Sequence, residues 1–132
     1  MIVNQGDLYW VSLDGSSGSE PGYTHPHVVI QENVLNHSRI RTVAICALTT
    51  NLKRAKAPGN VLLEAGEANL PKQSVVVVSQ VSTVDQAQLG EYVGTLDKPR
   101  IDQILAGMRF LQRMTEHPER GEENNGTSEI SS

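Results

Sequence analysis

Residues 18–30 read GSEPGYTHPHVVI, a polar turn that runs directly into a strand. The turn combines glycine, serine and proline, which favour a constrained loop, with a carboxylate, a phenol, two hydroxyls and an imidazole. The positions from His27 to Ile30 are typical of a buried strand. Because reactive groups tend to lie on loops that a rigid scaffold positions, this junction is the first candidate for a functional site.

Short strands surround this junction on both sides in the sequence. Their branched and aromatic residues predict strands at residues 6–13, 27–31, 40–48, 60–63, 74–81 and 92–96. Alternation along the first strand puts Leu8 and Trp10 on one face and Tyr9 and Val11 on the other. Residues 14–26, 33–38 and 67–72 are expected to be loops or turns. The strand at 74–81 is expected to be buried on both faces, because it is rich in valine.

The hydrophobic period changes after these strands. Apolar residues recur every three or four positions at Ile101, Ile104, Leu105, Met108 and Leu111. This spacing predicts an amphipathic helix over 99–115, with Asp97 or Lys98 near its cap and Pro118 after its end. Many short strands followed by one helix predict a mainly β fold, either a small barrel or a strongly bent sheet closed by that helix.

The chain of 132 residues suits a single domain, which we expect over residues 1–116. Its net charge of −4 comes from the C-terminal end, because residues 116–132 hold five acidic and one basic side chain and the rest is neutral. Residues 117–132 are therefore expected to form an acidic, polar, disordered tail. The sequence has no membrane span and no secretion signal, and its one cysteine, Cys46, has apolar neighbours, so a reducing cytoplasmic location is expected.

The polar residues favour acid–base chemistry over metal chemistry. The four histidines do not have the spacing of a zinc site, and no glycine loop of the phosphate-cradling type precedes a helix, so neither a metal nor another cofactor is expected. Metal-free RNA cleavage requires a base, an acid and phosphate donors, and an imidazole such as that of His25 can exchange protons near neutral pH. Thr49 can donate to a phosphate, Lys53 and Arg54 can hold backbone phosphates, and Tyr23 can stack on a base.

Several of these motifs occur in one order that resembles the MazF/PemK/Kid family of bacterial toxins. They are GDLYWV at 6–11, GSEPG at 18–22, Pro26 before VVIQ at 28–31, LTT at 48–50, and the late strand followed by the closing helix, and together they cover about residues 2–115. The resemblance implies an SH3-like barrel that forms a homodimer. It also implies a metal-independent endoribonuclease that cuts single-stranded RNA into products with a 2′,3′-cyclic phosphate and a 5′-hydroxyl. A small antitoxin would cover its RNA groove.

The resemblance also assigns site residues. The family's threonine corresponds to Thr49, with Thr50 beside it, its loop residues to Ser19 and Glu20, and its strand-end glutamine to Gln80. The family has an arginine before the loop proline, and here that position is His25. Arginine is always charged and has a fork of donors, whereas histidine is charged part of the time and has at most two donors.

Two functional outcomes follow from His25 and remain open at the level of sequence. Cleavage persists with the imidazole as acid or base, or the protein binds RNA or antitoxin and cuts little. A gyrase-poisoning toxin of the same fold family is disfavoured, because the chain end lacks an apolar or aromatic tip. Ordinary structural roles compete for the same residues: His25 as a turn cap, His27 as a satisfied strand residue, Lys53 and Arg54 as a solvated loop, and Trp10 as core or interface.

Overall fold

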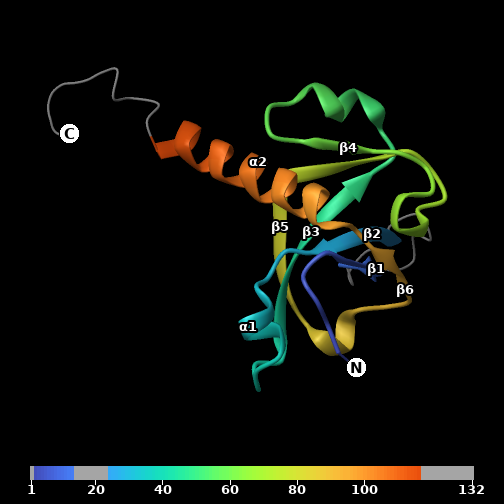
Figure 1. The fold of residues 1–132 in the computed structure, drawn as a ribbon, viewed down its shortest axis with the longest axis vertical. Helices are drawn as coiled ribbons and strands as arrows, with labels where there is room; N and C mark the ends of the chain where they lie inside the picture. The colour runs from blue at the N-terminus through green and yellow to red at the C-terminus, as the bar shows by residue number, and fades with distance from the viewer. Residues whose placement is uncertain (1, 14–23, 117–132) are drawn as a thin grey trace, which may run out of the picture.

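The computed structural model describes residues 2–13 and 24–116 of the chain (Figure 1). Its elements, with η for a 3₁₀ helix, are β1 (Asp7–Ser12), β2 (Thr24–Val29), α1 (Asn33–Asn36), β3 (Thr42–Thr49), η3 (Leu52–Lys56), β4 (Val61–Leu63), η4 (Glu67–Asn69), β5 (Ser74–Asp85), η5 (Gln86–Gln88), β6 (Tyr92–Thr95) and α2 (Lys98–Glu116).

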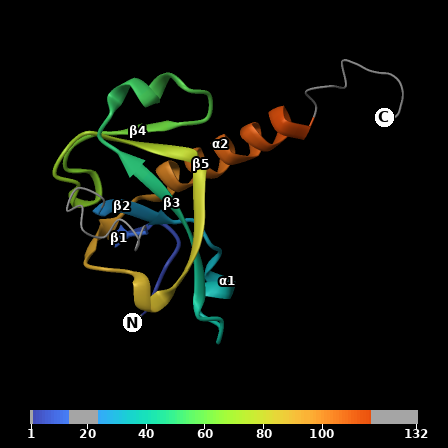
Figure 2. The same ribbon diagram turned by 180° about the vertical axis from the view of Figure 1, so that it is seen from behind.

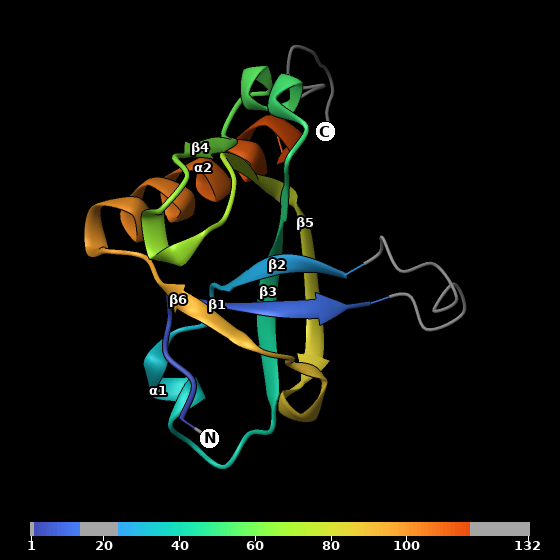
Figure 3. The same cartoon turned by 90° about the vertical axis from the view of Figure 1, so that its right-hand side faces the viewer.

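The six strands form one antiparallel sheet in the order β4-β5-β3-β2-β1-β6. Figures 1 and 3 show that the sheet curls strongly and that α2 lies against it near β4. The expected mainly β fold with a closing C-terminal helix is confirmed. The curled sheet is a half-barrel, because the edge strands β4 and β6 do not pair with each other within the described residues. Neither α1 nor α2, the α-helices of the described part, has both the length and the apolarity that a membrane crossing requires.

Strand alternation divides the buried side chains between the two faces of the sheet. On one face Leu8 and Val28 pack in a cluster that includes Ile104 of α2, and on the other Tyr9 and Val29 pack with a second cluster. The expected opposite orientation of Leu8 and Tyr9 is confirmed, as is the packing of the α2 stripe on the strands. Both faces of the sheet are therefore covered over part of their area, which explains why the start of β5 is buried throughout.

A wide bulge interrupts the pairing of β3 with β5. Cys46 lies opposite Val81 and Leu48 lies opposite Val76, so a two-residue step along β3 spans a five-residue step along β5. The extra backbone groups are paired locally. The Cys46 thiol donates to the Val77 carbonyl over 3.0 Å, and the Val78 N–H donates to the side-chain oxygen of Asn60 over 3.0 Å. A bulge of this kind bends the strand that carries it, and Figure 2 shows β5 turning sharply at this level.

Some element boundaries differ from the sequence prediction for reasons of pairing. β2 begins at Thr24 instead of His27, because Thr24 pairs with Ser12 at the end of the β1–β2 ladder. β5 continues to Asp85 instead of Val81, because its second half pairs with the start of β3. Residues 33–36 form the short helix α1 where only a turn was expected. The predicted tail at 117–132 lies outside the described residues.

Helix α2 approaches the turn before β4 through two glycines. A Cβ atom on Gly107 would lie 2.1 Å from the Gly59 carbonyl oxygen, and a Cβ on Gly59 would lie 2.8 Å from the Gly107 carbonyl oxygen. Gly59 also has a φ of +86°, a conformation that favours glycine. The two backbones are therefore in direct contact, and this contact sets how close α2 lies to the sheet.

We expect Gly107→Ala to lower the free energy of unfolding by about 1–3 kcal/mol, because the added methyl must push the helix away from Gly59. Helix propensity alone would give the opposite sign, a gain of about 1 kcal/mol. Urea titration followed by circular dichroism measures the difference. Arg109→Ala, at an exposed position of the same helix, is the control and should stay within about 0.5 kcal/mol of wild type. Increased stability of Gly107→Ala would contradict the contact.

Candidate functional site

The β1–β2 ladder holds His25 in a strand. Its neighbour Pro26 lies opposite Trp10 in the register. The Trp10 backbone bonds on its other side, donating to the Glu91 carbonyl and accepting from the Gly90 N–H. The missing N–H of Pro26 therefore costs no bond to β1, and the pairing of β2 with β3 begins only at His27 with Ala47. The β1–β2 ladder fixes the backbone of His25, which the sequence predicted to lie in a loop.

Thr49 is the last residue of β3, the strand next to β2. The β2–β3 pairing ends at His27 with Ala47, and a continuation of this register by two residues would put His25 opposite Thr49. Strand alternation puts both side chains on the same face of the sheet as Ile45. His25 is exposed and Thr49 is half-buried. The two residues proposed for chemistry from the sequence therefore stand at the same end of neighbouring strands, His25 near the start of β2 and Thr49 at the end of β3.

His27 supports this corner of the sheet from inside. Its side chain is 3% exposed, and its Nδ1 lies 2.9 Å from the His25 carbonyl oxygen. A carbonyl oxygen only accepts, so Nδ1 carries the hydrogen and donates it. Burial lowers the pKa of His27, which favours the neutral ring. His27 therefore acts as the satisfied structural residue that the sequence suggested and helps to hold the backbone of His25.

A hollow of about 270 Å³ opens where these strands end. It is lined by Trp10, Thr24, His25, Pro26, Thr50, Leu70, Pro71, Lys72 and Ser74. Trp10 is half-buried and reaches this hollow, and its assignment to core or interface stays a prediction. The contribution of the segment between η4 and β5 was not predicted, because the sequence does not indicate that this segment folds back beside residue 25.

The other predicted RNA-binding residues lie apart from this hollow or outside the described residues. Arg54 in η3 lines a separate hollow next to Leu111 of α2. Lys53 is exposed in the same η3 turn and is not among the residues that line the His25 hollow. Gln80 is exposed within the β5 bulge. Ser19, Glu20 and Tyr23 fall in residues 14–23, which the structure does not describe.

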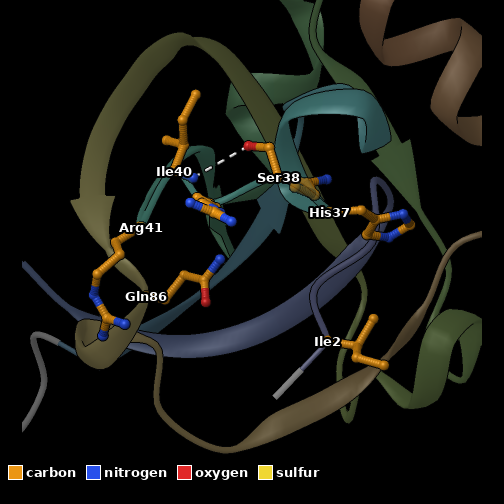
Figure 4. A pocket seen from close by; sticks show the side chains of 8 residues that line it. Ile2, His37, Ser38, Ile40, Arg41 and Gln86 are labelled. Atoms are coloured by element: carbon orange, nitrogen blue, oxygen red, sulfur yellow. Dashed lines mark hydrogen bonds between the residues drawn. The ribbon is translucent and has the colours of Figure 1, made fainter.

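A larger hollow of about 690 Å³ lies at the opposite end of β3 (Figure 4). It is lined by Ile2, Asn36, His37, Ser38, Arg39, Ile40, Arg41 and Gln86. His37 is held by Asn4 over 2.8 Å, and Arg41 lies 3.7 Å from Asp85. None of the sequence-predicted site residues lines it, so the His25 hollow remains the candidate site. Across residues 2–13 and 24–116, no group of three or more His, Cys, Asp or Glu side chains is placed to hold a metal ion.

Comparison with known proteins gives the family. The family described as "PemK-like, MazF-like toxin of type II toxin-antitoxin system" matches residues 4–111. The chain belongs to this family. It is 35% identical over 109 residues to the endoribonuclease MazF6 of Mycobacterium tuberculosis, covering 83% of this chain and 96% of that relative. It is 32% identical over 104 residues to the endoribonuclease EndoA of Bacillus subtilis, covering 79% of this chain and 89% of that relative.

Solved structures share the MazF-like fold. An endoribonuclease from a mycobacterial species matches with a TM-score of 0.68 and 18% identity over 86% of this chain and 93% of its own. MazF from Deinococcus radiodurans matches with a TM-score of 0.67 and 20% identity over 86% of this chain and 99% of its own. A mycobacterial endoribonuclease solved with its cognate antitoxin matches with a TM-score of 0.66 and 19% identity over 85% of this chain and 96% of its own. These likenesses confirm the expected fold.

An ion pair holds the loop that completes the hollow of this MazF-like domain. Arg100 of α2 donates from Nε and from one terminal nitrogen to the two carboxylate oxygens of Glu67, over 2.9 and 2.7 Å. Glu67 also accepts from the Glu64 N–H over 2.8 Å. The hydrogen bonds from Arg100 lower the pKa of Glu67. Both side chains are 26% exposed, so solvent screens this pair less than a fully exposed one.

We expect Glu67→Gln to lower the free energy of unfolding by about 1 kcal/mol at pH 7. Because the folded pKa of Glu67 is lowered, its stabilisation is complete above the ordinary glutamate pKa of about 4.3 and is lost as pH falls through the folded value. Urea titrations at neutral and acid pH measure this difference.

The control for Glu67→Gln is Asp102→Asn, which breaks the exposed pair with Lys98 on the same helix and should change stability little. A Glu67→Gln difference that stayed constant from neutral to acid pH would rule out the charged pair as its source.

Proposed function

We propose that this chain is the toxin of a type II toxin–antitoxin pair and that it cleaves single-stranded RNA in the cytoplasm without a metal. The observation that carries the proposal is the meeting of the start of β2 with the end of β3, where His25 and Thr50 line one hollow and a continuation of the β2–β3 register would put His25 opposite Thr49. Membership of the toxin family and the likeness to the endoribonucleases MazF6 and EndoA support it.

In the proposed reaction the ribose 2′-oxygen attacks the adjacent phosphorus and the bond from phosphorus to the 5′-oxygen breaks. The products are a 2′,3′-cyclic phosphate and a 5′-hydroxyl. His25 exchanges the proton as acid or base, since it is the exposed imidazole at the site. Thr49 donates its hydroxyl to a phosphate oxygen as charge develops there. The proton balance is closed because one proton leaves the 2′-hydroxyl and one reaches the departing 5′-oxygen.

RNA binding extends beyond these two residues in the proposal. Thr50 lines the same hollow as His25 and offers a further hydroxyl there. Ser19, Glu20 and Tyr23 belong to the residues between β1 and β2 in the sequence and would contact RNA as well. Lys53, Arg54 and Gln80 would contact the RNA farther from the scissile bond. Two copies of residues 1–116 would form the homodimer, and a small antitoxin would cover its RNA groove, as a related endoribonuclease has been solved with its cognate antitoxin. The acidic residues 117–132 would lie outside this domain.

A second function, binding without efficient cleavage, is favoured by one feature of the chain. The family resemblance expects arginine where His25 stands, and arginine would keep a permanent charge and a donor fork on the phosphate. With histidine there, the same groove can hold RNA or antitoxin while the chemical step is slow.

Cleavage of a mixed single-stranded RNA pool in the presence of a chelator separates these two functions. We expect the wild type to cut and His25→Ala to lose at least about 100-fold in rate, the usual contribution of a positioned acid or base. Thr49→Ala should cut RNA more slowly, because it lacks the hydroxyl that donates to the phosphate oxygen. His37→Ala, a histidine at the opposite end of β3, is the matched control and should cut at the wild-type rate.

The variant His25→Arg distinguishes imidazole catalysis from binding without efficient cleavage. Cleavage by wild type with a pH dependence that disappears in His25→Arg supports imidazole catalysis. If His25→Arg cuts and wild type does not, the natural chain is the binding protein and the endoribonuclease proposal is wrong.

A further inference from the structure

Lys72 lines the same hollow as His25, although it precedes β5, which is separated from the His25 strand β2 by β3. The hollow collects the end of β1, the start of β2, the residue after β3 and the start of β5, and Lys72 stands just before β5. Of the described residues that line it, Lys72 is the one with an ammonium group, and none of these described residues has a carboxylate. A phosphate that entered this hollow would therefore meet a lysine without competition from an acidic side chain of the described lining.

The segment that carries Lys72 is fixed at both ends. Before it, Leu70 is 2% exposed and its carbonyl accepts from the Gly66 N–H over 2.8 Å. After it, the hydroxyl of Ser74, itself 2% exposed, donates to the Lys72 carbonyl over 2.9 Å. The ion pair of Glu67 with Arg100 ties the preceding turn to α2. The backbone of Lys72 is therefore held in place, and only its flexible side chain has to be ordered by a ligand.

The Lys72 ammonium has no ionic partner among the residues that the structure describes. The ion pairs found there join Arg41 with Asp85, Lys98 with Asp102 and Arg100 with Glu67. The cations that the sequence singled out are placed elsewhere, since Arg54 lines a hollow against α2. Lys72 is thus an unneutralised cation at the rim of the candidate site.

We propose that Lys72 binds an RNA phosphate next to His25 and supplies the permanent positive charge that an imidazole holds only part of the time near neutral pH. This inference rests on the proposed function of the His25 hollow. Lysine binds phosphate as a point charge and reads no base, so its contribution is to affinity and to placement of the backbone, independent of RNA sequence.

Binding of a mixed-sequence single-stranded RNA with 2′-O-methyl sugars tests the contact, because this probe cannot form the cyclic phosphate. Anisotropy titrations of the full chain between about 50 and 200 mM salt give the dissociation constant and its salt slope. Lys72→Ala should weaken binding about 3- to 10-fold and reduce the slope by about 0.7, the loss of one phosphate contact on a single strand. Lys72→Arg should keep the wild-type dissociation constant and salt slope. The thermal unfolding of both variants should match that of the wild type.

The control is Lys98→Ala, which removes an exposed lysine at the start of α2 and should leave affinity and slope at wild-type values. A double-mutant cycle adds a second readout. If Lys72 supplies the charge that His25 lacks, Lys72→Ala should cost less affinity in the His25→Arg background than in wild type. If the role of Lys72 were purely structural, Lys72→Ala would reduce RNA affinity by the same factor in both backgrounds.

The outcomes separate this inference from the function on which it rests. If the wild type binds and cuts RNA while Lys72→Ala keeps the wild-type slope, the role of Lys72 is wrong and the endoribonuclease proposal stands. If the wild type neither binds the probe nor cuts RNA, both are wrong. Should Lys72→Ala not fold, Lys72→Gln, which keeps most of the side chain, is measured against the same slope.

Discussion

The bulge in β5 is the constraint on which the rest of the structure depends. Without the extra residues between Val76 and Val81, β3 and β5 would pair in one continuous register and the sheet would stay flatter. The bend leaves room for α2 beside β4, next to the buried cluster that includes Ile104. Two backbone groups of the bulge, the Val77 carbonyl and the Val78 N–H, are paired with the Cys46 thiol and the Asn60 side chain. Burial raises the pKa of Cys46 to about 12, so this thiol stays protonated and keeps its donor.

The candidate site is a consequence of where strands end on this bent sheet. β1 ends and β2 begins at the same edge, β3 finishes there, and β5, which pairs with β3 on the side away from β2, starts there as well. Polar side chains that would be isolated on a single strand become neighbours at this edge. The interior histidine, His27, is hydrogen-bonded and its burial lowers its pKa, whereas His25 is exposed two residues away on the same face. The same strand therefore provides one histidine for structure and one for chemistry.

Local patterns predicted the fold well, and the site in part. Alternating apolar residues located the strands, and apolar residues at every third or fourth position located α2. The motifs around His25 and Thr49 indicated the family before any geometry was known. Pairing partners could not be read in the same way. The length of β5 and the early start of β2 depend on which strand lies alongside, and Lys72 reaches the His25 hollow only because the chain folds back after η4. Lys53 and Arg54 formed the more obvious basic cluster, but proximity in sequence did not bring Arg54 to His25.

The ion pair between Arg100 and Glu67 has a consequence for control at a distance. It connects the start of α2 to the turn at Glu67, which precedes the residues that line the hollow. A ligand that moves one of these segments therefore also moves the other. A molecule that drew Arg100 away from Glu67 would release the rim and weaken a ligand in the hollow. By thermodynamic reciprocity, a ligand in the hollow would weaken that molecule's hold on α2 by the same factor. Binding at the outer surface of the first turn of α2 would thus change the affinity of the hollow for its ligand without any contact with that ligand.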